Sequence, residues 1–173
     1  MAHYVRVGLL GGFVGGVLMS MVEMTTELMM GHSFFTPTYM IAAPFVGMRP
    51  METAMKSPGF AYFDPGPVMI GMLGHFGWAL LWGLVFGLIA WRLRLYGGAA
   101  AVGAIVYSYV IAFVMSYVVL PFVRLQPIPA SSGWGAFVLM HAGYGIGLAI
   151  VAWLGTRIAG AAIAERGRVE KIA

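Results

Sequence analysis

Two glutamates lie inside an apolar run that is long enough to cross a membrane. Glu23 and Glu27 are four residues apart in the stretch 7–31, so both lie on the same side of one helix. An ionisable side chain inside a membrane span is costly and commonly belongs to a functional site. The chain has only six Asp and Glu residues, and the other four lie outside apolar runs. The pair is therefore the first candidate site.

Two histidines occur in matching motifs. His75-Phe-Gly-Trp78 and His141-Ala-Gly-Tyr144 each begin eight or nine residues into an apolar run. At about 1.5 Å of helix rise per residue, the two glutamates and two histidines lie about 6–13 Å from the same end of their spans. Four-helix bundles commonly build cofactor sites from facing side chains at one level. We therefore predict that the four residues form one polar layer near the extracytoplasmic side.

The four side chains predict a metal site. Neutral imidazole and carboxylate suit iron, copper, zinc or manganese, and Glu23, Glu27, His75 and His141 supply four donors. One ion is favoured over two, because a ferritin-like pair of ions requires Glu-x-x-His motifs and more carboxylates. A bound metal would keep the glutamates ionised, whereas an empty layer would favour the neutral acids.

A b-type haem is the second cofactor that the pattern allows. His75 and His141 lie at similar depth on helices that run in the same direction, as two axial ligands require. Haem leaves the glutamates without a role unless they carry protons or lie against a quinone, so we rank a metal ion first. Copper has a further argument, because 11 of the 14 methionines fall between Met19 and Met72 and thioethers suit Cu(I). Methionine is also an ordinary gap-filler in apolar packing.

The structural alternative is a polar plug that only fixes the register of the helices. In that case Glu23 and Glu27 are hydrogen bonded to neighbouring polar side chains, since buried polar groups need partners. The partners on offer are His75, His141, Tyr107, Tyr117 and Ser116. We favour a functional site, because packing gives no reason to collect the intramembrane acids and histidines in one layer.

The elements that position these residues follow from composition. Hydrophobic residues make up 61% of the chain and charged residues 9%, which is typical of integral membrane proteins rather than soluble domains. Four runs reach the roughly 20 apolar residues that a bilayer requires. They cover residues 7–31, 66–91, 97–123 and 133–156. Because nothing alternates as in a membrane barrel, we predict an all-α, polytopic bundle of four transmembrane helices, with residues 1–173 in a single domain.

The bundle is expected to consist of two duplicated, parallel helical hairpins, because the two histidine motifs occupy equivalent positions. Glycines four residues apart predict close contacts between helices. They are Gly8, Gly12 and Gly16, then Gly83 and Gly87, then Gly143 and Gly147. The extracytoplasmic loop 32–65 contains an apolar stretch that is too short to span. We expect this stretch to lie in the interface or to cap the site.

Basic residues predict the orientation, because Lys and Arg near span ends stay in the cytoplasm. In the predicted topology, seven of the ten Lys and Arg residues lie on the side of the chain termini and three lie on the opposite side. The seven are Arg6, Arg92, Arg94, Arg157, Arg166, Arg168 and Lys171, and the three are Arg49, Lys56 and Arg124. We expect a bacterial cytoplasmic (inner) membrane protein with both termini cytoplasmic and an uncleaved first helix. The net charge of +4 follows from this topology, and nucleic-acid binding is not expected.

The glutamate-bearing first helix and the His-x-Gly-Trp/Tyr motifs resemble those of small bacterial four-helix membrane proteins without an assigned function. This resemblance carries over no catalytic residues. Three functions follow from the residues. The first is a metal- or haem-binding subunit associated with an electron-transfer membrane complex. The second is a cofactor-free accessory subunit that packs against other membrane proteins or copies of itself. The third is a small proton or metal-ion transporter whose glutamates titrate.

Overall fold

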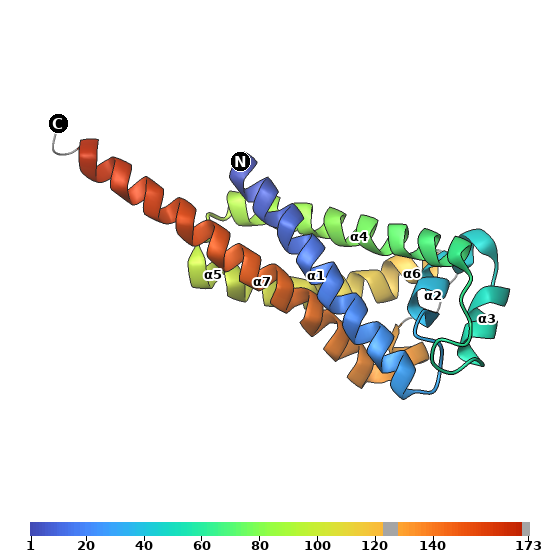
Figure 1. Cartoon of the computed structure of the whole chain (residues 1–173). Helices are drawn as coiled ribbons and strands as arrows, with labels where there is room; N and C mark the ends of the chain where they lie inside the picture. Colours follow the sequence, from blue (N-terminus) through green and yellow to red (C-terminus); the bar gives the residue numbers. More distant parts are fainter. Residues whose placement is uncertain (123–127, 171–173) are drawn as a thin grey trace.

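The computed structural model describes the backbone of residues 1–122 and 128–170, and the side chains of residues 1–122 and 133–157. All the named elements of the described chain are helices (Figure 1). The long helices are α1 (Ala2–Met29), α4 (Pro65–Arg92), α5 (Gly97–Val114) and α7 (Ile128–Glu170). The short ones are α2 (Thr36–Val46), α3 (Arg49–Met55), the π-helix η1 (Met115–Val119) and α6 (Leu120–Phe122).

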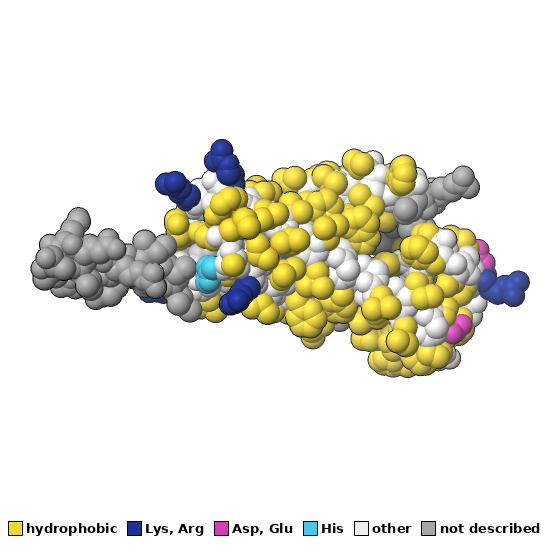
Figure 2. All heavy atoms as spheres, turned by 90° about the horizontal axis from the view of Figure 1, so that it is seen from above, with side chains coloured by type: hydrophobic (Ala, Val, Ile, Leu, Met, Phe, Trp, Pro, Cys, Tyr) yellow, Lys and Arg dark blue, Asp and Glu magenta, His cyan; other side chains and the backbone are white. Residues whose placement is uncertain are grey.

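Four segments are long and apolar enough to cross a membrane. They are Ala2–Met29, Pro65–Arg92, Gly97–Phe122 and Gly133–Arg157. The predicted all-α bundle of four transmembrane helices is confirmed, and the chain is a multi-pass membrane protein. Its surface has the matching character: Figure 2 shows an apolar face along the helices, with Lys and Arg side chains gathered at its ends.

The four long helices pack in an open series rather than a closed square. α1 and α7 lie against each other at the centre, α4 packs on α1, and α5 packs on α7. α4 and α5 have little contact with each other, although both flank the same central pair (Figure 1). The series therefore leaves a space between α4 and α5 that side chains must fill.

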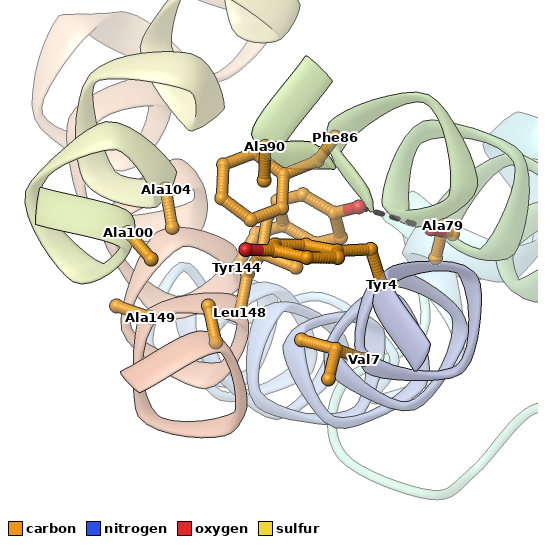
Figure 3. Close-up of a cluster of buried hydrophobic side chains, with 11 residues drawn as sticks. Tyr4, Val7, Ala79, Phe86, Ala90, Ala100, Ala104, Tyr144, Leu148 and Ala149 are labelled. Carbon is orange, nitrogen blue, oxygen red and sulfur yellow. Dashed lines mark hydrogen bonds between the residues drawn. The ribbon is translucent and has the colours of Figure 1, made fainter. Parts of the chain in front are cut away.

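One half of the bundle fills this space completely. We call it the closed half; it is the half that contains the start of α1. Its buried cluster consists of Tyr4, Val7, Ala79, Phe86, Ala90, Ala100, Ala104, Tyr144, Leu148, Ala149 and Ala152. Figure 3 shows the rings of Tyr4, Phe86 and Tyr144 close together among alanines of the surrounding helices. Tyr107 also links α5 to α4, because its hydroxyl donates a hydrogen bond to the Trp82 carbonyl at 2.8 Å.

Glycine spacing sets the approach of α1 to its neighbours, as the sequence predicts. A Cβ on Gly12 would lie 2.5 Å from the Ala79 carbonyl oxygen and 2.9 Å from the Gly83 Cα. A Cβ on Gly147 would lie 2.6 Å from the Gly15 Cα of α1. Backbones this close admit no side chain between them, which is the usual reason for small residues at helix contacts in lipid.

The segment between α1 and α4 folds back over the other end of the bundle. Tyr39 of α2 is fully buried in a small cluster with Ala54 of α3 and Val68 of α4. Burial raises the pKa of the Tyr39 hydroxyl, which stays neutral and accepts the Asp64 amide hydrogen at 2.7 Å. Asp64 in turn caps α4 by accepting from the Gly66 amide at 3.2 Å. The apolar stretch of the loop is thus a helical cap.

The helix that continues from α5 is irregular. Pro121 has no amide hydrogen to give to the Tyr117 carbonyl, so the regular i to i−4 ladder cannot continue there. The chain takes the π-helix η1 at Met115–Val119 instead, where the Leu120 amide donates to the Met115 carbonyl. A second irregularity lies at Gly133, whose φ of 81° interrupts the helical backbone of α7.

Candidate functional site

The half of the bundle next to α2, which we call the open half, contains a cavity of about 610 Å³. Residues of α1, α4, α5, η1, α6 and α7 line it, together with residues of the short helices α2 and α3. The lining is apolar except for a few side chains. Volumes of this order are typical of small-molecule sites, which combine apolar walls with a few placed polar groups.

All four residues that the sequence singled out line this cavity. Glu23 and Glu27 reach it from α1, His75 from α4 and His141 from α7. Each of the four is buried, with an exposed fraction of 9% or less. The expected convergence of two carboxylates and two imidazoles on one space is therefore present in the described structure. What they bind there stays a prediction.

His75 joins α4 to α1. Its Nε2 lies 2.9 Å from the Gly16 carbonyl oxygen. A carbonyl oxygen has two lone pairs, and the side chain of Ser20, one turn later in α1, does not use one of them. The Ser20 hydroxyl turns instead to the Val17 carbonyl at 2.9 Å. The other ring nitrogen, Nδ1, lies 4.0 Å from Glu23 Oε2. This separation is too long for a direct hydrogen bond, but a ligand atom that lies beside both groups could bridge them.

His141 is held by its own helix. Its Nδ1 lies 2.8 Å from the Phe137 carbonyl oxygen, one turn earlier in α7. The ring of Phe137 packs against it at a centroid distance of 4.9 Å. The free nitrogen of His141 is therefore Nε2. The two histidines share a motif in the sequence but differ in their anchors.

Glu27 is paired with a residue that the spacing analysis did not include. Its Oε2 lies 2.6 Å from His32 Nδ1, a short hydrogen bond between two ionisable groups. The backbone makes the same link, since the His32 amide donates to the Glu27 carbonyl at 3.0 Å. The signal in the sequence was a histidine directly after Gly31, the glycine that follows α1. A ring at this position can fold back onto the last turn of the helix.

Methionine supplies much of the apolar wall. Seven of the 14 methionines of the chain line this cavity. They are Met19, Met40, Met48, Met51, Met55, Met115 and Met140. Trp78 and Trp82 stack on one side, with centroids 6.1 Å apart, and the Trp82 indole donates to Met115 Sδ at 3.2 Å. Long, flexible thioether side chains give the wall an adaptable shape.

The donors fit a single metal ion poorly. Across the described side chains, no three His, Asp or Glu residues are grouped closely enough to hold one ion. A metal in this layer would need further donors, methionine thioethers included. A haem would have to use His75 Nδ1, next to the ring attachment, or displace the bond from Nε2 to Gly16. Both predicted cofactors thus require rearrangement.

The structure contains only some of the hydrogen bonds that the polar-plug alternative predicts. Tyr107 donates to Trp82 rather than to a glutamate. Ser116 is fully buried, and its hydroxyl oxygen has no hydrogen-bond partner among the described residues. Neither glutamate is bonded to His141, whose Nδ1 is bound to Phe137. The layer is therefore incompletely paired, which differs from a network built only to fix register.

Comparison with known protein families, curated proteins and solved structures finds no match to this chain.

Proposed function

We propose that the protein binds a lipid-soluble redox carrier of the quinone class in its cavity and works as a subunit of an electron-transfer system in the membrane. The observation that carries the proposal is the cavity: about 610 Å³ of largely apolar space within the spans, with Glu23, His75 and His141 at its wall. Such a carrier has a flat polar head and a long apolar tail. It would place the head against these residues and the tail against methionine or lipid.

The position of the cavity supports a ligand that arrives from the bilayer. Phe45 and Met48 line it yet are 77% and 46% exposed, and Trp78 is 40% exposed. Phe45 and Met48 belong to the cap and Trp78 belongs to α4, so exposed apolar side chains of both parts mark the edge of the cavity. A lipid-soluble molecule could enter between them without crossing water. An ion would instead need a polar path, which these three side chains do not offer.

The test is to ask what the native protein carries. The full chain is purified in mild detergent, without chelator and without a histidine tag, and one sample is assayed for extractable quinone, metal content and visible absorption. We expect about one quinone per chain. Stoichiometric metal or a haem band would instead support the cofactors predicted from the sequence. A sample with none of the three would support the accessory-subunit function.

A matched pair of variants tests whether the cavity is the site. Gly74 lines the cavity, whereas a Cβ on Gly77, three residues further along the same helix, meets nothing within 4 Å. Gly74→Phe should lower the bound quinone severalfold because its ring takes up cavity space. Gly77→Phe should leave it unchanged. Equal loss in both variants would show that the carrier binds elsewhere.

We further propose that the protein lies in a bacterial cytoplasmic membrane with both termini in the cytoplasm. Arg6, Arg92 and Arg157 support this orientation, because each lies near the end of its span that is on the same side as the chain termini. Arg124 and Lys171, and the side chains of Arg166 and Arg168, lie outside the described residues. Since the chain has no cysteine, Lys56→Cys in the exposed cap should react with a membrane-impermeant maleimide from outside the cell. Labelling only after lysis would reverse the topology.

A further inference from the structure

Both imidazoles at the cavity have a fixed tautomer. His75 Nε2 lies 2.9 Å from the Gly16 carbonyl oxygen and His141 Nδ1 lies 2.8 Å from the Phe137 carbonyl oxygen. A carbonyl oxygen only accepts, so each of these nitrogens bears the ring hydrogen. A neutral imidazole has one such hydrogen. His75 Nδ1 and His141 Nε2 therefore carry lone pairs.

The tyrosine and one of the two tryptophans of the wall have their hydrogens already placed. The Tyr144 hydroxyl donates to the Ala79 carbonyl at 2.9 Å (Figure 3). The Trp82 indole donates to Met115 Sδ at 3.2 Å. Trp78, 40% exposed at the outer wall, is the lining indole whose N–H has no bond to a described residue. Apart from the two carboxyl groups, the inner wall thus offers acceptors more than donors.

We propose that the cavity selects the reduced, hydroxyl-bearing form of its carrier, a hydroquinone, over the oxidised quinone. This inference rests on the proposed function, since it names the redox state that the same site binds. A quinone presents two carbonyl oxygens that only accept, and these would face the lone pairs of His75 and His141. A hydroquinone has two O–H groups, which donate to acceptors of this kind.

Glu23 is consistent with the same selection. Its Oε2 lies 4.0 Å from His75 Nδ1, so one hydroxyl of a ligand could lie beside both and donate to either. Glu27 contributes less, because its Oε2 already shares a hydrogen bond of 2.6 Å with His32. A site whose buried acceptors await hydroxyl donors discriminates against analogues that lack them.

The experiment compares three ligands on the full-length protein in detergent or nanodiscs. Isothermal titration calorimetry under anaerobic conditions measures Kd for a short-tailed hydroquinone, the matching quinone and the hydroquinone dimethyl ether. We expect the hydroquinone to bind roughly tenfold to hundredfold more tightly than the other two. Equal or tighter binding of the quinone would overturn the inference and leave the proposed function standing. Binding of none of the three would refute the proposed function itself.

Variants of the histidines locate the selection. His75→Leu and His141→Leu should each weaken hydroquinone binding about tenfold and leave quinone binding unchanged. The matched control is His3→Leu, because His3 is exposed at the far end of the bundle and bonds the Gly155 carbonyl. An equal loss for both ligands would contradict selection by these lone pairs. The three-ligand comparison on the unaltered chain decides the inference even if a variant fails to fold.

Discussion

The closed and open halves of the bundle use the same four helices in different ways. In the closed half, small residues let α1 touch its neighbours, and the rings of Tyr4 and Phe86 fill the space between α4 and α5. In the open half the same space is a cavity of about 610 Å³, covered by α2 and edged by a π-helix. The difference shows that a membrane bundle can be tightly packed and still keep room for a ligand, provided that the two properties lie at different depths.

Gly12→Leu should have the largest effect on stability. Its side chain would enter the contact with Ala79 and Gly83 in the closed half. The contacting atoms there belong to the backbone, so they cannot move aside as a flexible side chain would. We expect a loss of about 3 kcal/mol or more, or no folded protein at all. Thermal unfolding in detergent measures it, with Gly77→Leu as the control because Gly77 faces open space. Similar melting of the two variants would contradict a rigid closed half.

Phe86→Ala tests the same half by removal. Phe86 is 1% exposed, and its ring cannot be replaced by lipid. We expect a loss of roughly 2–4 kcal/mol, mainly from packing, because lipid tails remove the hydrophobic term. Met140→Ala, at the cavity wall and 4% exposed, should lose less than half as much, since one side of it already faces a void. An equal loss would mean that the two halves are packed alike.

Glu27→Gln should loosen the cap without unfolding the bundle. The change keeps the shape but turns the carboxyl group that lies 2.6 Å from His32 into an amide, at a loss of about 1 kcal/mol. Hydrogen exchange should accelerate across 32–47 and stay unchanged in the closed half. Glu52→Gln, exposed on α3, is the control. Faster exchange in both variants would show that the pair does not fasten the cap.

Ser116→Ala should have the smallest effect. The Ser116 hydroxyl is buried without a hydrogen-bond partner among the described residues, so its removal leaves no new unpaired group. We expect stability to stay the same or to rise by up to about 1 kcal/mol. A clear loss in the same unfolding assay would show that this hydroxyl is bonded to a group outside the described residues.

Much of the fold could be predicted from the sequence because membrane spans obey a simple rule. A run that is apolar for about 20 residues must satisfy its backbone internally, so it is a helix. The glycine spacing of α1 likewise indicated its contacts with α4 and α7. The anchor of His75 could not be predicted, because it depends on the Gly16 carbonyl of another helix. The partner of Glu27 was missed because the turn after Gly31 brings His32 back to it.

The sequence by itself determined four transmembrane helices and the positions of Glu23, Glu27, His75 and His141 along them, since helix length and rise are fixed by backbone geometry. Only the tertiary structure decided that α4 and α5 stay apart, because that depends on how side chains of all four helices fill a shared space. It also decided which ring nitrogens are occupied, since the orientation of an imidazole is set by the carbonyl that happens to lie within reach. These two outcomes place the four residues of the predicted layer at the wall of a cavity.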